Sequence, residues 1–124
     1  MKIWVLNGPN LGRLDLRDHN IYGDITFKDL VDFCVNCGKS LGLDVEVRQS
    51  DSETEIIHWL HDAAEKKIPI AFNPAAFTHY SYAIRDAVAM LQAPIIEVHL
   101  SNPLSREEFR HTSVVSGVAT GTIG

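Results

Sequence analysis

The stretch S-E-T-E-I-I-H-W-L-H-D-A-A-E-K-K-I-P-I-A-F, Ser52 to Phe72, joins one predicted helix directly to one predicted strand. Ser52 with Glu55 three residues later is a capping-box pattern, and the apolar residues that follow predict a helix to about Lys67. The run from Ile68 to Phe72 is short and apolar, which is typical of a strand. A helix that passes at once into a strand indicates an α/β fold.

The same alternation extends along the rest of the chain. Short apolar runs predict four further strands, at Lys2 to Leu6, Asp44 to Arg48, Pro94 to Val98 and Gly117 to Ile123. Helical patterns occupy Phe27 to Leu41 and Thr78 to Leu91. We therefore predict a single α/β domain with a doubly wound, parallel, five-stranded sheet, flavodoxin-like winding, strand order 2-1-3-4-5 and helices on both faces.

Composition narrows the kinds of partner. The chain has 124 residues and a formal net charge of −5, which disfavours nucleic acid and anionic membranes and favours a small-molecule partner. No apolar run approaches the roughly 20 residues of a membrane helix. The amino terminus enters a predicted strand without a secretory-signal pattern, so we expect a cytoplasmic protein.

The cysteines and histidines give no metal-site pattern. Cys34 and Cys37 form a lone C-x-x-C inside the predicted helix Phe27 to Leu41, whereas redox pairs usually lie at a helix N-terminus and zinc sites need a second pair. We interpret both as packing residues of that helix. His58 and His61 lie among polar residues on another helix, which indicates a solvated face. We expect no metal and no cofactor.

Polar residues gather where ligands bind in such folds. The segment from Gly8 to Gly23 is long for a connection between strand and helix, which takes about two to six residues, and this favours a functional loop. Ligands of open parallel sheets lie at the carboxyl ends of the strands. The polar residues just after the predicted strands suit a small polar substrate, and they include Asn7, Asn10, Asn73, His79, Glu97, His99, Ser101 and Asn102.

Several short blocks of sequence lie along nearly the whole chain. They are N-G-P-N-L-G-R-L at Asn7 to Leu14, I-Y-G at Ile21 to Gly23, R-Q-S-D-S-E at Arg48 to Glu53, N-P-A-A-F-T-H at Asn73 to His79, R-D-A at Arg85 to Ala87, I-E-V-H-L-S-N at Ile96 to Asn102 and R-E-E-F-R-H at Arg106 to His111. In content and in order, these blocks resemble the type II 3-dehydroquinate dehydratases. The resemblance implies a hydro-lyase that converts 3-dehydroquinate to 3-dehydroshikimate by anti elimination of water through an enolate, without a metal or a Schiff base.

The resemblance also implies catalytic roles. Tyr22 matches the base, and a phenol, which is almost wholly protonated at neutral pH, needs a neighbouring cation such as Arg17. His99 matches the acid, and Glu97, two residues earlier on the same strand face, orients it. Asn10 matches the residue that helps to stabilise the enolate.

Substrate contacts and assembly follow from the same resemblance. The residues implied to hold substrate are Asn73, His79, Ser101, Arg110 and the backbone of Leu100. Asp86 matches a residue that reaches the substrate of a neighbouring subunit, which implies a homo-oligomer of trimers assembled into a dodecamer. We expect residues 1–124 to form one type II dehydroquinase domain that lacks the C-terminal helix of the family.

Departures from the family pattern leave two alternatives open. Arg17, Asp18 and His19 stand where R-E-P is common, Asp15 stands where glycine is common, and Pro103 and Leu104 replace the more usual residues before R-E-E-F-R. The alternatives are a non-catalytic flavodoxin-like binding module and a degenerate assembly subunit. The residues after the first strand form neither G-x-G-x-x-G nor a P-loop, which disfavours a nucleotide-binding module. The sequence leaves open whether the reaction serves aromatic amino-acid biosynthesis through the shikimate pathway or quinate catabolism.

Overall fold

The computed structural model describes all residues from 1 to 124, and five parallel strands form its centre. The strands are β1 (Lys2–Asn7), β2 (Asp44–Gln49), β3 (Ile70–Asn73), β4 (Ile95–Val98) and β5 (Gly121–Ile123). The sheet order is β2-β1-β3-β4-β5, and every pair is parallel, which confirms the predicted order. The chain runs outward from β1 to β2 and then returns to β3, so the winding direction reverses between β1 and β3.

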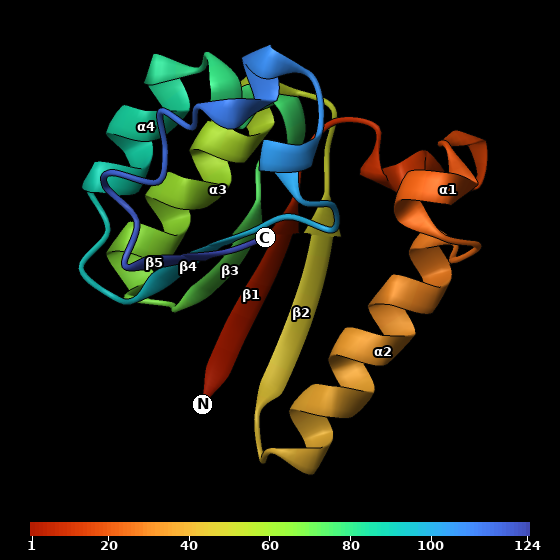
Figure 1. Ribbon diagram of the computed structural model, residues 1–124. Coiled ribbons are helices and arrows are strands. Elements are labelled where there is room, and N and C mark those ends of the chain that lie inside the picture. The colour runs from red at the N-terminus through yellow and green to blue at the C-terminus, as the bar shows by residue number, and fades with distance from the viewer.

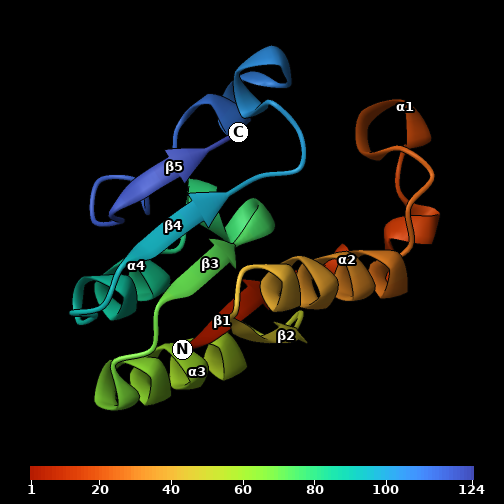
Figure 2. The same ribbon diagram turned by 90° about the horizontal axis from the view of Figure 1, so that it is seen from below.

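Four α-helices and four short 3₁₀ helices connect the strands. The α-helices are α1 (His19–Tyr22), α2 (Phe27–Ser40), α3 (Glu53–Lys66) and α4 (Tyr82–Ala89). The 3₁₀ helices are η1 (Leu11–Leu16), η2 (Ala75–His79), η3 (Pro103–Ser105) and η4 (Glu108–His111). Figures 1 and 2 show α3 and α4 together on one face of the sheet and α2 on the other, beside β1 and β2. This arrangement confirms helices on both faces.

The hydrophobic core lies between the sheet and the pair α3 and α4. Alternate residues of β1, β3 and β4 point into it, as period-two alternation along a strand requires. The core joins these residues to apolar side chains of the two helices, and its members include Trp4, Leu6, Ile56, Leu60, Ile70, Phe72, Ile84, Val88 and Ile95. On the opposite face α2 approaches β2 closely, because a Cβ on Gly38 would lie 2.3 Å from a methyl of Val45.

Several predicted boundaries move for local reasons. The helix expected from Thr78 to Leu91 is divided into η2 and α4, because the Ser81 hydroxyl accepts the backbone N–H of Ile84 at 3.1 Å and begins a new helix there. The fifth strand is three residues long, starting at Gly121. The long segment from Gly8 to Gly23, expected to be irregular, contains η1 and α1.

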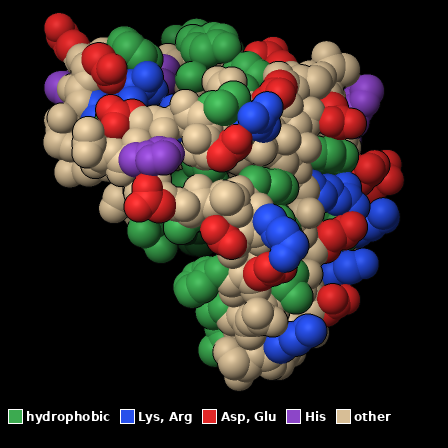
Figure 3. Space-filling model, turned by 90° about the vertical axis from the view of Figure 1, so that its right-hand side faces the viewer, with side chains coloured by type: hydrophobic (Ala, Val, Ile, Leu, Met, Phe, Trp, Pro, Cys, Tyr) green, Lys and Arg blue, Asp and Glu red, His purple; other side chains and the backbone are tan.

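The outer surface of α2 corrects one interpretation. Cys34 is half-buried but Cys37 is exposed, so only the first of the two cysteines packs. Figure 3 shows the side of the molecule formed by α1 and α2, where acidic and basic side chains interleave without a single-sign patch. None of the helices is both long enough and apolar enough to cross a bilayer.

Candidate active site

The carboxyl ends of the strands enclose a recess at the edge where the winding reverses. Its volume is about 380 Å³ including its open mouth. Gly8 brings β1 close to β3, since its N–H donates to Asn73 O at 2.7 Å and a Cβ there would lie 2.5 Å from Pro74 O. Most of the predicted site residues line the recess, namely Arg17, Tyr22, Asn73, His79, His99, Leu100, Ser101 and Arg110.

One wall of the recess holds a tyrosine between two arginines. The Tyr22 hydroxyl oxygen accepts from Arg17 Nη2 at 2.5 Å and from Arg106 Nη1 at 2.5 Å. The Arg17 guanidinium also lies 4.1 Å from the centre of the Tyr22 ring, and that of Arg106 lies 5.3 Å from it. Two permanent positive charges therefore donate hydrogen bonds to one phenolic oxygen.

Arg106 is a site residue that the sequence interpretation missed. It begins the block R-E-E-F-R-H, but only Arg110 of that block was predicted in the site. Arg106 also donates to the Ser101 hydroxyl at 3.3 Å, so it links the base to the loop after β4. The sequence did contain a signal for Arg106, because the block R-E-E-F-R-H follows the fourth predicted strand and contains two arginines. Arg13, on the same segment as Arg17, pairs with Asp15 at 3.0 Å on the surface.

The opposite wall holds a histidine backed by a buried carboxylate. His99 Nε2 lies 2.5 Å from Glu97 Oε2, and only 1% of the Glu97 side chain is exposed. The two residues share a strand face because they are two positions apart. Nδ1 is therefore the ring nitrogen of His99 that Glu97 leaves free. The His99 side chain lines the recess. A carboxylate behind an imidazole fixes its orientation and stabilises the imidazolium.

The environment of Glu97 keeps it ionised. Burial alone would raise its pKa, but hydrogen bonds from His99, Thr78 and Ser116 and the charge of His99 outweigh burial and hold the pKa of Glu97 below its ordinary value. Thr78 donates to Glu97 Oε2 at 2.7 Å and Ser116 to Oε1 at 2.8 Å. The histidine therefore has a negatively charged partner at neutral pH.

The remaining lining residues offer directed polar groups. The Asn73 side chain accepts the backbone N–H of Ala75 at 3.0 Å, next to the left-handed φ of 52° at Ala75. His79 Nδ1 lies 2.8 Å from the Thr112 carbonyl, which can only accept, so Nδ1 carries the proton. Arg110 Nε donates to Glu107 at 2.5 Å. These contacts fix side chains that a polyhydroxylated acid can use.

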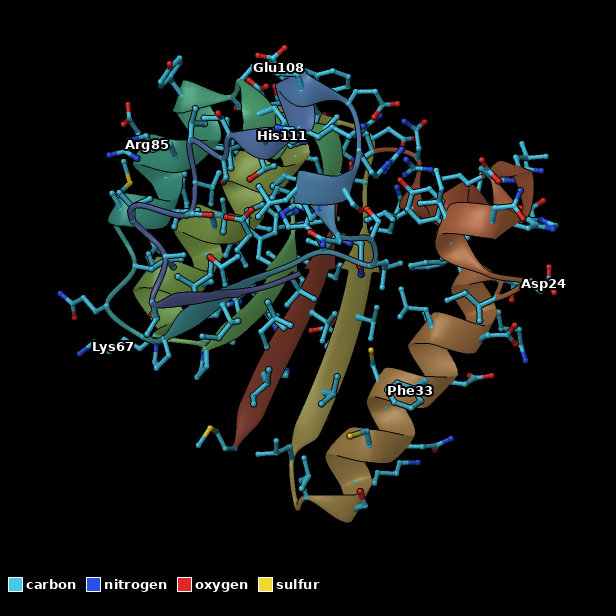
Figure 4. The ribbon with its side chains drawn as sticks, viewed as in Figure 1. Asp24, Phe33, Lys67, Arg85, Glu108 and His111 are labelled. Carbon is cyan, nitrogen blue, oxygen red and sulfur yellow. The ribbon has the colours of Figure 1, made fainter.

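Three predicted residues do not line the recess. Glu97 does not line it and contacts His99 Nε2 through its carboxylate. Asn10 has a left-handed φ of 69° and its backbone N–H donates to Asp51 at 2.8 Å, but its side chain is outside the recess. Asp86 lies on α4, and Figure 4 shows α4, marked by Arg85, on the side of the molecule away from α1. One chain therefore does not bring Asp86 to Tyr22.

The recess contains neither a metal-ligand cluster nor a lysine. No group of three or more His, Cys, Asp and Glu side chains lies close enough together to hold a metal ion. The lining residues include three arginines but no lysine, so no amine is present that can form an imine with a ketone. Tyr22 and His99 both line the recess, and tyrosine and histidine side chains are able to exchange protons with a bound substrate.

Comparison with known proteins supports this chemistry. The family model described as "Dehydroquinase class II" matches residues 1–124. The chain belongs to the class II dehydroquinase family. The 3-dehydroquinate dehydratase of Salinispora tropica is 57% identical over 99% of this chain and 86% of its own length, and that of Mycobacteroides abscessus is 55% identical over 99% and 85%.

A solved structure confirms the fold of this dehydroquinase family member. The crystal structure of the type II dehydroquinase from Propionibacterium acnes has a TM-score of 0.97 and 56% sequence identity, and the match covers 99% of this chain and 85% of that one. At this identity the sheet order, the helix positions and the recess belong to one shared architecture. The expected family and the flavodoxin-like fold are both confirmed.

Proposed function

We propose that this protein is a 3-dehydroquinate dehydratase that converts 3-dehydroquinate to 3-dehydroshikimate. The observation that carries the proposal is Tyr22, held by Arg17 and Arg106, on one wall of the recess and the His99–Glu97 pair on the other. Membership of the class II dehydroquinase family and the names of close relatives support the same reaction. The pathway is the shikimate route of aromatic amino-acid biosynthesis or the catabolism of quinate.

The first step is removal of a proton next to the ketone. Tyr22 as phenolate takes this proton, and the electron pair of the broken C–H bond moves to the ketone oxygen to give an enolate. The guanidinium groups of Arg17 and Arg106 favour the phenolate before the step. Asn10, as the resemblance implies, supports the enolate, because charge that develops on oxygen is stabilised by directed donors.

The second step is loss of the hydroxyl group as water. The imidazolium of His99 gives its Nδ1 proton to the departing hydroxyl while the enolate electrons form the C=C bond. Glu97 retains its bond to Nε2 and compensates the imidazolium charge before transfer. The proton held by Tyr22 returns to His99 through solvent, so the net products are one water and the enone.

Substrate binding falls to the side chains between the two walls. We assign Asn73 and His79 to hydroxyl groups of the substrate, since both have fixed polar atoms in the recess. Ser101 and the backbone N–H of Leu100 suit the carboxylate. Arg110 completes this set, because a guanidinium binds carboxylates and hydroxyls with directed hydrogen bonds.

Assembly and location belong to the same proposal. Asp86 and two large side chains, Tyr82 and Met90, are exposed on or beside α4, with Tyr82 and Met90 68% and 58% exposed. This surface suits contact with another copy of the chain, which would bring Asp86 to a neighbouring recess in trimers that form a dodecamer. A cytoplasmic location is consistent with two free cysteines, which persist in reducing compartments.

A direct assay tests the reaction. Purified protein is mixed with 3-dehydroquinate, and the growth of enone absorbance is followed. We expect turnover, no loss of activity after borohydride treatment with substrate, and no covalent adduct by intact mass. Absence of turnover in correctly folded protein would favour a binding module or an assembly subunit over an enzyme.

A further inference from the structure

A cluster of hydroxyl groups surrounds Glu97 on the side away from the recess. Ser113, Ser116 and Thr122 line a second, open hollow of about 950 Å³ that also reaches Glu97 and His99. Thr122 on β5 donates to the Ser116 hydroxyl at 3.3 Å, so the cluster begins on the edge strand. None of these three hydroxyls lines the substrate recess.

The cluster surrounds both oxygens of the Glu97 carboxylate. Oε2 accepts from Thr78 at 2.7 Å and lies 2.5 Å from His99 Nε2, while Oε1 accepts from Ser116 at 2.8 Å. The Ser113 hydroxyl lies 3.0 Å from Oε1 and 3.1 Å from Oε2, and it also lies 2.7 Å from the Thr78 hydroxyl. Since a hydroxyl has one proton, Thr78 and Ser113 share their protons between each other and the carboxylate.

This set of donors discriminates between the two protonation states of Glu97. A protonated carboxyl group carries its own O–H, which must point at an acceptor. Both Glu97 oxygens already have donors, Ser116 on Oε1 and Thr78 and the His99 ring on Oε2, so one of these groups would have to turn its hydrogen away before Glu97 could be protonated. The arrangement favours the ionised form and one fixed orientation.

Few other charges face this carboxylate. His99 is the only ionisable side chain in hydrogen-bond contact with Glu97. His79 of η2 and Arg110 and His111 of η4 line the same hollow, and Figure 4 shows His111 on the turn above the sheet. Arg85 of α4 donates instead to the Val114 carbonyl at 2.7 Å. The neutral hydroxyls are therefore the main partners of Glu97 besides His99.

We propose that Thr78, Ser113 and Ser116 are positioning residues of the reaction. Their hydroxyls hold Glu97 ionised and in one orientation, so that it binds Nε2 of His99 and leaves Nδ1 toward the substrate. The effect of the hydroxyls on turnover rests on the proposed function. Their effect on the protonation and orientation of Glu97 does not. The hydroxyls act on the acid through Glu97, without touching the substrate.

Two of the hydroxyls give the cleaner test. The Ser113 hydroxyl also accepts the backbone N–H groups of Val115 and Ser116, at 3.1 and 3.0 Å, so its removal would disturb the turn itself. The Ser116 hydroxyl has no backbone partner, and Ser116→Ala removes one donor. Thr78→Val keeps the shape of the side chain and removes the other, while Thr78→Ser restores a hydroxyl.

The first measurement needs no substrate. Carbon-13 labelling of glutamate carboxyl groups follows the protonation of Glu97 with pH, and Glu97→Gln identifies its signal. Removing one donor from the charged form should raise the pKa of Glu97 by about one unit in Ser116→Ala and in Thr78→Val, equivalent to about 1.4 kcal/mol. Thr78→Ser should titrate like the wild type, and so should Ser40→Ala, a matched exposed hydroxyl that bonds Cys37 O at the end of α2.

The second measurement is the pH profile of turnover with 3-dehydroquinate. In both donor-deleted variants the acid limb of kcat should move upward with the Glu97 titration, about tenfold in rate on its steep part, with KM unchanged. An unchanged Glu97 titration in both variants would overturn the proposal. A shifted titration with an unmoved kcat profile would overturn the link through His99. Absence of turnover in the wild type would instead reject the proposed function and leave the titration as the test of the cluster.

Discussion

Tyr22 and His99 line one recess but are held by different kinds of structure. Tyr22 ends α1, a four-residue helix with no buried residue, and its hydroxyl is fixed by two charged guanidinium groups. His99 follows strand β4, and its partner Glu97 is buried among neutral hydroxyls. Two charged guanidinium groups thus hold the Tyr22 hydroxyl, whereas hydrogen bonds from neutral hydroxyls hold the carboxylate beside His99.

The contacts of Tyr22 and those of Glu97 should respond differently to salt and to mutation. Charge pairs near solvent weaken when water and salt reach them. A buried carboxylate with all its donors in place is insensitive to salt, but the loss of one donor leaves it unsatisfied. Damage to the base side should therefore appear mainly in the rate, and damage to the acid side in both rate and stability.

The largest effect should come from removing the phenolic oxygen. Tyr22→Phe should lower kcat by roughly 10³-fold, since a positioned base contributes about 10² to 10⁴. KM should change little, because the ring remains. Steady-state kinetics test this, with Tyr80→Phe, an exposed tyrosine beside η2, as the matched control. A defect confined to KM would remove Tyr22 from the role of base.

Removal of either arginine should have the next largest effect. Arg17→Ala and Arg106→Ala should each lower kcat by roughly 10²-fold, as the loss of one oxyanion donor does. The loss in the double variant should fall short of the sum of the two single losses, because both arginines act on one oxygen. Fully additive losses would mean that the two arginines act independently of that oxygen.

The pH dependence of stability should distinguish the contacts of Glu97 from those of Arg17. The folded state lowers the pKa of Glu97 below its ordinary value of 4.5, so its contribution to stability is present above that pH and is lost as the pH falls through the folded value. Glu97→Gln should lower stability at pH 7 by roughly 2 kcal/mol, and the difference from wild type should shrink at acid pH. Thermal unfolding from pH 3 to pH 8 measures this. Arg17→Ala should leave the same curve nearly unchanged, and equal losses in both variants would contradict the comparison.

The smallest expected effect is that of a chelator. Neither wall contains a cluster of ligands for a metal ion. Exhaustive EDTA treatment should therefore leave kcat and KM unchanged, and added zinc should restore nothing. A chelator-sensitive rate that zinc recovers would show that a metal ion acts as a Lewis acid in the reaction. The roles proposed for Tyr22 and His99 would then be wrong.

The local part of this architecture was predictable from the sequence. Arg17 and Tyr22 lie on one segment, and Glu97 and His99 are two residues apart on one strand, so short-range periodicity places each pair together. The alternation of strands and helices likewise gave the correct sheet order. These features depend on neighbours in the chain.

The long-range part was not predictable in the same way. Arg106 reaches Tyr22 across 84 positions, and Ser116 reaches Glu97 across 19, through turns without periodicity. The split of the expected helix near Ser81 depends on one side-chain cap inside a continuous helical pattern. The predicted role of Asp86 stays a prediction, since it involves a second copy of the chain.

The contact between Tyr22 and Arg106 also affects when the site can form during synthesis. Because 84 positions separate the two residues, a nascent chain that has emerged as far as α4 contains Tyr22 and Arg17 but not the second guanidinium. Bringing the ends of so long a loop together costs entropy, which the β3 and β4 pairings must first offset. Ribosome-bound fragments that end before Arg106 should therefore fold much of the sheet and remain inactive, and the pairing of the base with both arginines should be among the last events of folding.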